Sequence, residues 1–318
     1  MKAATIVETA EGIALELREA PQPEPGAGQL LLRVRASALN RGELLPTGKP
    51  GARPAGVEAV GEVAALGKGV EGLVEGMRVM ARCKGGFAEY ALVDAGEALA
   101  VPERLSWEQA AAVPIVFLVA YDMLVPYGHV GRGDWVLVTA VSSGVGVASL
   151  QLAKTLGARV IGSSGAPEKL ERLRALGLDA GIATRGDLAA DAMRITEGHG
   201  ADLSINNIGG SVLPELVRAA AYRGRIAIVG YVDGSLEAPL DLGAVHSKRL
   251  EIFGVSNRLR SAAERAETVA GFKRDCLSWL ADGTIVPLVD RVFEFHAIGE
   301  ARAAFDRNAH VGKIVLRM

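Results

Sequence analysis

The sequence predicts an α/β protein with two domains, one built on a doubly wound parallel sheet and the other mainly β. The chain has 318 residues, which is more than one hydrophobic core usually serves. From residue 134 onwards, apolar strands alternate regularly with helices, as in a parallel sheet covered on both faces. Residues 2–105 instead show short strands separated by turn residues, a pattern typical of a small, partly antiparallel β domain.

Composition and charge exclude several classes of protein. Apolar residues make up 49% of the chain and charged residues 23%, which favours a packed interior over disorder. The 35 Lys and Arg nearly balance the 37 Asp and Glu, so we expect no nucleic-acid partner. The first residues lack the apolar core of a signal peptide, and the longest apolar stretch, residues 110–121, is short and contains Pro114. We therefore expect no membrane span.

Two cysteines bear on the compartment. Cys83 and Cys276 lie far apart in the sequence and show none of the close pairing of a zinc site. We interpret them as free, reduced thiols, which predicts a cytoplasmic protein.

The first domain is predicted from short β segments followed by a long helix. The segments are LELREA, LLLRVRASAL, VGEVAALG and MRVMA. Ser106 then heads SWEQAAAVPIVFLVAYDMLV, where an N-cap serine with an acidic residue in the first turn predicts the start of one long apolar helix.

The second domain is predicted to hold six parallel strands. They are DWVLVTA, ARVIGS, residues 178–183, ADLSINN, GRIAIVG and RLEIFGVS. Helices are expected between them, among others over residues 144–156, 167–176 and 211–222. This is the doubly wound Rossmann pattern of dinucleotide-binding domains. The tail, with helices over residues 261–281 and 299–307 and strands VDRVFEF and GKIVLRM, is expected to fold back onto the first domain.

A candidate phosphate site follows the first of these strands. WVLVTAVSSGVGVASLQLAKTLG places a buried strand, a turn of small residues and a helix in the order that a pyrophosphate site requires, because backbone N–H groups at a helix start bind anions. Gly146 is the expected close-packing glycine, whereas Val141 and Ser143 stand where the simplest GxGxxG pattern has glycines. The alternative is that SSGVG is only a helix-starting turn.

The end of the second strand favours NADPH over NADH. Ser163 and Ser164 stand where an NAD-preferring site presents Asp or Glu to the ribose hydroxyls. A carboxylate there would repel a 2′-phosphate, whereas two hydroxyls followed by Lys169 would accommodate it. Lys169 can equally be an ordinary solvated helix lysine.

Taken together, several segments resemble the zinc-independent quinone oxidoreductases of the medium-chain dehydrogenase/reductase superfamily. The resemblance covers nearly the whole chain. The segments that carry it are PQPEPGAGQLLLRVRASALNRGEL, PAGVEAVGEVAALGKGVEGLVEGMRVM, GGFAEYALV, SWEQAAAVPIVFLVAYDML, VTAVSSGVGVASLQLAKTLGARVIGSS, INNIGG, GRIAIVG and GKIVL.

This resemblance implies how the domains are arranged. It implies a catalytic, GroES-like domain over residues 1–113 and 257–318, a Rossmann domain over residues 114–256, and an active cleft where they meet. It also implies a homodimer formed through the edge strand RLEIFGVS, which would cover an otherwise unpaired sheet edge.

The resemblance also predicts that the protein binds no zinc. Zinc-dependent relatives hold the catalytic ion through three residues, whose positions here carry Asn40, Val57 and an apolar residue near Ile115. Val and Ile have no lone pairs to donate to a metal. The four-cysteine lobe of a structural zinc is missing as well.

The site residues are carried over from the family by position. Asn40 is expected beside the nicotinamide, its amide a candidate donor to the substrate carbonyl; otherwise it is a turn asparagine that holds the backbone. The remaining expected cofactor contacts are Val119, Ser142, Ser143, Gly144, Val145, Gly146, Ser163, Ser164, Lys169, Asn207, Gly230, Tyr231, Gly254, Val255 and Lys313.

Without a Lewis acid, the acceptor must take hydride readily, as quinones and conjugated carbonyls do. We therefore expect an NADPH-dependent quinone oxidoreductase; the alternatives are a reductase of α,β-unsaturated carbonyls and a low-turnover NADPH-binding protein. The tyrosine that protonates the product in related enoyl reductases is missing from NRGELLPTGKPGARP, which weighs against the first alternative. Glu43 and Glu58 are possible proton relays, although the resemblance implies that Glu58 is more often a buried structural acid.

A second departure from the family affects the adenosine phosphate. The family's usual tyrosine after the third strand is replaced by Thr184, with Arg185 as a possible substitute.

Overall fold

The computed structural model describes residues 1–10, 12–183 and 186–318. The chain divides into two compact units: unit 1 comprises residues 1–118 and 260–318, and unit 2 comprises residues 119–259. From the sequence, these divisions were expected at 113/114 and 256/257. Residues 184 and 185, named above as a possible adenosine phosphate contact, lie outside the described residues.

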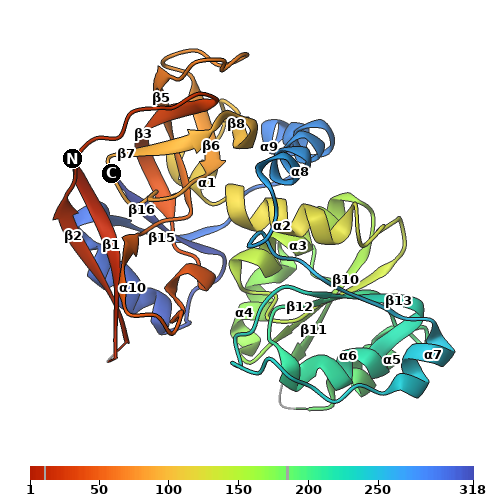
Figure 1. The fold of residues 1–318 in the computed structure, drawn as a ribbon. Coiled ribbons are helices and arrows are strands. Elements are labelled where there is room, and N and C mark those ends of the chain that lie inside the picture. Colours follow the sequence, from red (N-terminus) through yellow and green to blue (C-terminus); the bar gives the residue numbers. More distant parts are fainter. Residues whose placement is uncertain (11, 184–185) are drawn as a thin grey trace. The chain divides into compact units, whose positions relative to one another are not determined.

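Unit 1 is mainly β, as predicted (Figure 1). In its described residues, a three-stranded sheet has the order β2 (Gly12–Glu19), β1 (Lys2–Thr9), β4 (Gly51–Pro54). A larger sheet has the order β15 (Val289–Glu294), β16 (Lys313–Arg317), β3 (Gln29–Ala38), β5 (Glu58–Leu66), β6 (Arg78–Arg82), β8 (Ala98–Ala100), and β7 (Tyr90–Asp94) also pairs with β3. Strand β16 runs antiparallel to β3, so the tail does fold back onto the first domain.

The helices of unit 1 are shorter than the sequence predicted. The expected single helix after Ser106 is two helices, α1 (Trp107–Ala111) and α2 (Pro114–Leu124). Pro114 has no N–H for a continuing helical bond and disfavours helical geometry at the residue before it. The tail helix is likewise divided at Cys276, whose φ of −126° is not helical, into α8 (Ala262–Asp275) and α9 (Leu277–Asp282).

The remaining short elements of unit 1 are α10 (Ile298–Asp306) and the 3₁₀ turns η1 (Gly42–Leu44), η2 (Ala95–Glu97) and η4 (Phe295–Ala297). Of these, η1 follows β3 directly and carries Glu43, so it matters for the site described below.

Unit 2 is the predicted doubly wound parallel sheet. In its described residues six strands lie in the order β11 (Ala180–Ala183), β10 (Arg159–Ser164), β9 (Trp135–Val138), β12 (Ala201–Asn206), β13 (Ala220–Ile228), β14 (Glu251–Gly254). All neighbouring pairs are parallel. The helices between them are α3 (Gly144–Thr155), α4 (Pro167–Arg174), α5 (Leu188–Ile195), α6 (Leu213–Ala219), which follows the turn η3 (Gly210–Val212), and α7 (Leu242–Lys248).

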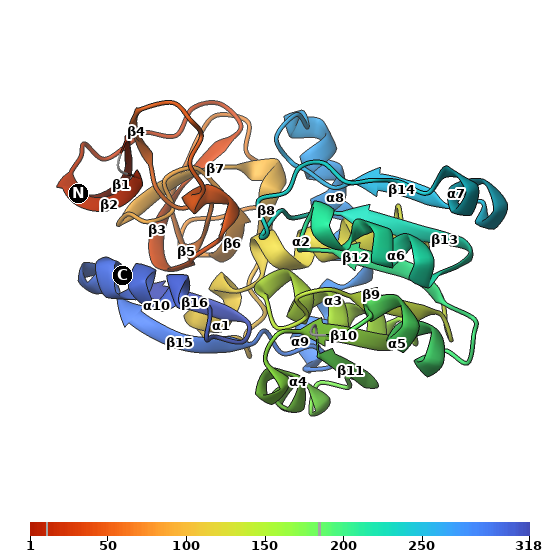
Figure 2. The same ribbon diagram turned by 90° about the horizontal axis from the view of Figure 1, so that it is seen from below.

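The two faces of this sheet are covered by different helices. Figures 1 and 2 show α3 on one face and α5 and α6 on the other, as right-handed crossovers require. Leu137, Ile161 and Ile226 of the strands pack with Leu188 of α5 and Leu216 of α6 in one buried cluster. Burial on both faces explains why these strands read as continuous apolar runs in the sequence.

One predicted helix boundary in unit 2 was wrong. The helix expected over residues 211–222 ends at Ala219, and β13 begins at the next residue. The chain then passes through Arg223 with a φ of +62°, and the register of β13 against β12 shifts near its start. An irregular strand start of this kind leaves no periodic signal in the sequence.

Within residues 1–10, 12–183 and 186–318, no helix combines the length and the apolar character that crossing a bilayer needs.

A buried ion network ties the tail to the first part of unit 1. Glu97 in η2 is 3% exposed. It accepts hydrogen bonds from Arg82 Nε at 2.6 Å and Nη2 at 2.9 Å, and from Arg265 Nε of α8 at 2.7 Å. Burial alone would raise the pKa of Glu97, but these two guanidinium groups outweigh it and hold the pKa below its ordinary value.

We expect Glu97→Gln to destabilise unit 1 by about 3 kcal/mol, because it leaves two partly buried guanidinium groups without their charge partner. Urea denaturation checks this. The matched control is Glu171→Gln, which removes an exposed pair with Arg174 and should change the free energy of unfolding by less than about 0.5 kcal/mol. Equal effects of the two substitutions would contradict the prediction.

Candidate functional site

The turn between β9 and α3 brings backbone into very close contact. Ser143 is the N-cap of α3, and its side chain accepts a hydrogen bond from the Gly146 N–H at 3.1 Å. A Cβ on Gly146 would lie 2.5 Å from the Val141 carbonyl oxygen and 2.6 Å from that of Ala140. Only glycine therefore fits at position 146.

The start of α3 is partly accessible to solvent. Ser143, Gly144 and Val145 are partly exposed, while Ser142 and Gly146 are buried. The first N–H groups of a helix lack helical acceptors and carry the positive end of the helix dipole. This turn can therefore hold an anionic group such as a pyrophosphate.

The end of β10 places the two predicted serines differently. The Ser163 side chain is completely buried, and its hydroxyl has no hydrogen-bond partner among the described residues. Ser164 is 6% exposed, and its oxygen accepts a hydrogen bond from the Ala166 N–H at 3.2 Å, just before α4. Lys169 lies partly exposed in α4, one residue after the exposed Glu168, a carboxylate that the sequence prediction did not take into account.

The turn after β12 is held by asparagine side chains. Asn207 donates from its backbone N–H to Thr139 Oγ1 at 2.9 Å and from Nδ2 to the Thr139 carbonyl at 2.8 Å. Asn206, which was not predicted from the sequence, accepts from the N–H groups of Ile208 and Gly209. These bonds join the ends of β9 and β12 and make the turn rigid.

The remaining predicted contacts follow neighbouring strands. Gly230 donates its N–H to the Asn206 carbonyl at 3.2 Å, and Val255 donates to the Ile228 carbonyl at 2.9 Å. Tyr231 is 47% exposed. Because the sheet is parallel, the segments after β9, β10, β12, β13 and β14 share its carboxyl edge, where open α/β sheets bind ligands. Val119 lies partly exposed in α2.

In unit 1, a buried polar cluster surrounds Asn40; we call Asn40, Glu43, Glu58 and Lys313 the Asn40 cluster. The Glu58 side chain is fully buried and that of Lys313 is 5% exposed. Lys313 Nζ donates to Glu58 Oε1 at 2.9 Å, to Asn40 Oδ1 at 2.7 Å and to the Leu39 carbonyl at 2.9 Å. Glu58 Oε2 accepts the Ile115 N–H at 2.9 Å.

The Asn40 amide is fully engaged in this cluster. Its Nδ2 donates to Glu58 Oε1 at 2.7 Å and to the Ala38 carbonyl at 3.1 Å. Of the two roles considered from the sequence, the bond to the Ala38 carbonyl shows that the side chain holds backbone; its role as a donor to a substrate stays a prediction.

The Glu43 carboxylate links the backbone at Asn40 to the backbone at Gly56. It accepts the Asn40 N–H at 3.3 Å and the Gly56 N–H at 2.9 Å. Burial, reinforced by the charge of Glu58, raises the pKa of Glu43 from 4.5 to about 7, against the opposing effects of the Gly56 N–H and Lys313. This carboxyl can therefore gain or lose a proton near neutral pH.

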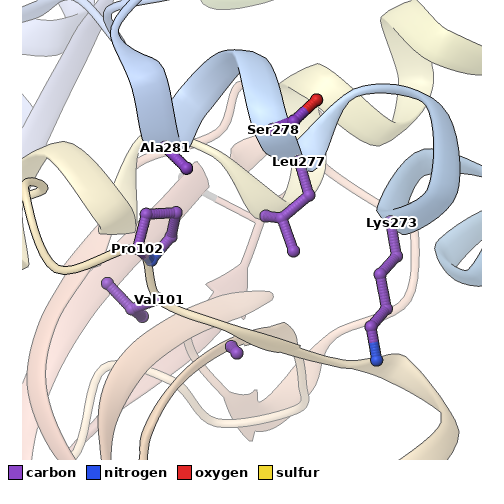
Figure 3. A pocket seen from close by; sticks show the side chains of 7 residues that line it. Val101, Pro102, Lys273, Leu277, Ser278 and Ala281 are labelled. Atoms are coloured by element: carbon purple, nitrogen blue, oxygen red, sulfur yellow. The ribbon is translucent and has the colours of Figure 1, made fainter.

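An open apolar depression lies elsewhere in unit 1 (Figure 3). It has a volume of about 360 Å³ and is lined by Val101 and Pro102 on one side and by Leu277 and Ala281 of α9 on the other. Lys273 and Ser278 are the polar residues of its lining. It contains neither a buried carboxylate nor a glycine turn, so we do not include it in the candidate site.

Family models match both units of the chain. The model described as an alcohol dehydrogenase GroES-like domain matches residues 26–103, and the model described as a zinc-binding dehydrogenase matches residues 144–270. Their order is that of the mainly β unit followed by the parallel-sheet unit. The chain belongs to the medium-chain dehydrogenase/reductase superfamily.

A curated relative within this superfamily is much longer than the chain. A phenolphthiocerol/phthiocerol polyketide synthase of Mycobacterium tuberculosis is 30% identical over 311 residues, which are 95% of this chain. The chain spans only 14% of that protein's length.

Solved structures resemble the whole chain. An NAD-dependent alcohol dehydrogenase superposes with a TM-score of 0.85 at 29% identity, and a mycobacterial protein complexed with NADPH superposes with a TM-score of 0.90 at 25% identity. A mycobacterial quinone oxidoreductase superposes with a TM-score of 0.85 at 25% identity. Each comparison covers 100% of both chains.

The zinc in the name of one family model does not fit the residues of this chain. At the three positions that the resemblance assigns to the ligands of a catalytic zinc, the Asn40 side chain bonds Glu58 and Lys313, and Val57 and the apolar residue near Ile115 have no side-chain lone pairs. The described part of the chain contains no group of three His, Cys, Asp or Glu that could hold a metal ion. Burial raises the pKa of the nearby Cys83 thiol, which therefore stays protonated and is a poor ligand.

The bonding of Lys313 was not predicted from the sequence, which placed this residue only near the nicotinamide. The available signal was a lysine within the apolar strand GKIVL and a glutamate within the apolar segment PAGVEAVG. A charged residue at a core position needs a buried partner, but the sequence does not say which.

We expect Gly146→Ala to weaken binding of a reduced dinucleotide at least about tenfold, because the added methyl forces the turn open and one lost contact of about 1.4 kcal/mol is tenfold in affinity. Fluorescence titration with NADPH measures this. The control is Gly131→Ala, where the nearest atom to the new Cβ is at an ordinary 3.7 Å. Unchanged affinity in a folded Gly146→Ala protein would contradict the assignment of the turn.

We also expect Glu43 to make stability depend on pH. The pKa of Glu43 is higher in the folded chain than in the unfolded one. Its contribution to the free energy of unfolding is therefore fully present below pH 4.5 and is lost as the pH rises through about 7. For such a shift the loss is about 3 kcal/mol. Glu43→Gln should remove this loss. Urea denaturation well below and well above pH 7 tests this prediction, with a substitution of an exposed residue, Glu103→Gln, as the control. If the free energy of unfolding depends on pH in the same way in the wild type and in Glu43→Gln, the prediction is refuted.

Proposed function

We propose that this member of the superfamily is an NADPH-dependent, zinc-independent quinone oxidoreductase. The observation that carries the proposal is the glycine-closed turn at Ser142–Gly146, where added side-chain atoms at Gly146 would collide with backbone. Such a turn at the carboxyl edge of a parallel sheet is suited to a dinucleotide pyrophosphate.

The choice of NADPH rests on the end of β10. Ser163 and Ser164 stand there in place of the acidic residue that binds the ribose hydroxyls in NAD-preferring sites. The similarity to a mycobacterial protein complexed with NADPH supports this choice. The similarity to an NAD-dependent alcohol dehydrogenase and the exposed Glu168 make the cofactor preference the part of the proposal to test first.

The choice of a quinone rests on the chemistry of the Asn40 cluster. It offers hydrogen-bond donors and a neutral ion pair, and its two carboxylates belong to no group of three potential ligands among the described residues, so we propose an acceptor that is already electrophilic. The nicotinamide supplies the hydride when bound, and the Asn40 amide is proposed to donate to the acceptor oxygen on which charge develops. The similarity to a mycobacterial quinone oxidoreductase supports this class of acceptor.

The similarity to a polyketide synthase favours a second candidate, the reduction of α,β-unsaturated carbonyls by the same hydride transfer.

We propose further that the protein is a cytoplasmic homodimer. Both cysteines are free and buried, as in reducing compartments, and the edge strand β14 exposes Ile252, so pairing with a second copy would cover it.

Steady-state oxidation of NADPH and NADH with a panel of quinones and enones tests the proposal. We expect turnover with quinones and a lower dissociation constant for NADPH than for NADH, because β10 ends at Ser164 rather than at a carboxylate that would repel a 2′-phosphate. Turnover with enones alone would establish the second candidate. NADH bound as tightly as NADPH would overturn the cofactor assignment, and binding without turnover would overturn the enzyme function.

A further inference from the structure

Three side chains of the Asn40 cluster form a closed ring of hydrogen bonds. Lys313 Nζ bonds Asn40 Oδ1 at 2.7 Å, Asn40 Nδ2 bonds Glu58 Oε1 at 2.7 Å, and the same Glu58 oxygen accepts Lys313 Nζ at 2.9 Å. With the Leu39 carbonyl as its third acceptor, the Lys313 ammonium has used all three of its N–H groups. It has none left for a cofactor or a substrate.

This ring determines which way the Asn40 amide points. Turning the amide by half a rotation would place its NH₂ group against the Lys313 ammonium and its oxygen against the Glu58 carboxylate. Donor would then face donor and acceptor would face acceptor, at a place where both charged side chains are at most 5% exposed and an unmet polar group is costly.

The ring also polarises the amide. An ammonium that bonds the amide oxygen draws electron density from the nitrogen, so the Nδ2 hydrogens become stronger donors. One of these hydrogens is committed to Glu58, while the other makes the longer bond, 3.1 Å, to the Ala38 carbonyl. That second hydrogen is the one available for exchange to an acceptor oxygen.

We propose that Lys313 and Glu58 are positioning residues, which orient and polarise the Asn40 amide without touching cofactor or acceptor. This inference rests on the proposed function, since it assigns their effect to hydride transfer at Asn40. It differs from the role in cofactor binding, near the nicotinamide, that family resemblance implies for Lys313.

A double-mutant cycle tests the inference. Lys313→Met alone would leave Glu58 as an unpaired buried charge, so the paired variant Lys313→Met/Glu58→Gln keeps the cluster neutral. We expect this pair to lower kcat about 100-fold, as loss of one oriented donor to a developing oxyanion does, and to leave the dissociation constant of NADPH within about twofold. In an Asn40→Ala background the same pair should change kcat by less than about threefold, because residues that act through one group are not additive.

The control is Arg317→Met, which removes a half-exposed cation from the same strand and should leave kcat unchanged. If the paired variant lowers kcat as much in the Asn40→Ala background as in the wild-type background, the inference is overturned, because Lys313 and Glu58 would then act independently of Asn40. A large loss of NADPH affinity in the paired variant would also overturn it, because Lys313 would then contact the cofactor.

A second measurement separates this inference from the proposed function. If the wild-type chain binds NADPH but reduces no acceptor, the proposed function fails, and the ring is tested by NMR of the side-chain amides. The Asn40 NH₂ signals, assigned by their loss in Asn40→Ala, should shift in the paired variant and not in Arg317→Met. Unshifted signals would overturn the ring itself.

Discussion

The Glu58 carboxylate is fully buried, and a charge in that position must be surrounded by donors for the chain to fold. Its donors come from three separate segments: Asn40 after β3, Ile115 at the start of α2, and Lys313 at the start of β16. Residues far apart in sequence are thus tied to one side chain of β5. The expected site residue Asn40 takes its orientation from this arrangement, so the chemistry proposed for it depends on a pair of buried charges.

Unit 2 depends on a different constraint, the close approach of backbone to backbone. At Gly146 the absence of a side chain lets α3 start directly against the carbonyls of residues 140 and 141. The asparagines after β12 then use their side chains to hold neighbouring turns. Both devices hold a turn in one conformation, and a preformed turn lowers the entropic cost of holding a ligand. Unit 1 therefore uses buried charge for rigidity, and unit 2 uses backbone contact.

The fold class could be predicted because it depends on patterns that repeat along the chain. Buried parallel strands read as apolar runs, and the six in unit 2 were all found. Where the prediction failed, a single local event decided the outcome: Pro114 divides one expected helix, and a non-helical φ at Cys276 divides another. The candidate site was predicted less completely, since the sequence shows that Lys313 and Glu58 are charged residues in apolar surroundings but not that they share a hydrogen-bond ring with Asn40. Pairings between distant residues are properties of the fold and leave no periodicity in the sequence.

The charge of the Asn40 cluster limits the reactions that it can assist. Lys313 and Glu58 cancel each other, and Glu43 adds a negative charge only when it loses its proton. The cluster therefore supplies an oriented dipole, the Asn40 amide, rather than a net positive charge. A single amide dipole stabilises a developing oxyanion less than a metal ion would, so the function proposed above favours acceptors whose reduced form spreads the charge over a conjugated system. Quinones and conjugated carbonyls have this property, whereas simple aldehydes and ketones do not, so the proposed absence of zinc and the proposed class of acceptor are consistent with each other.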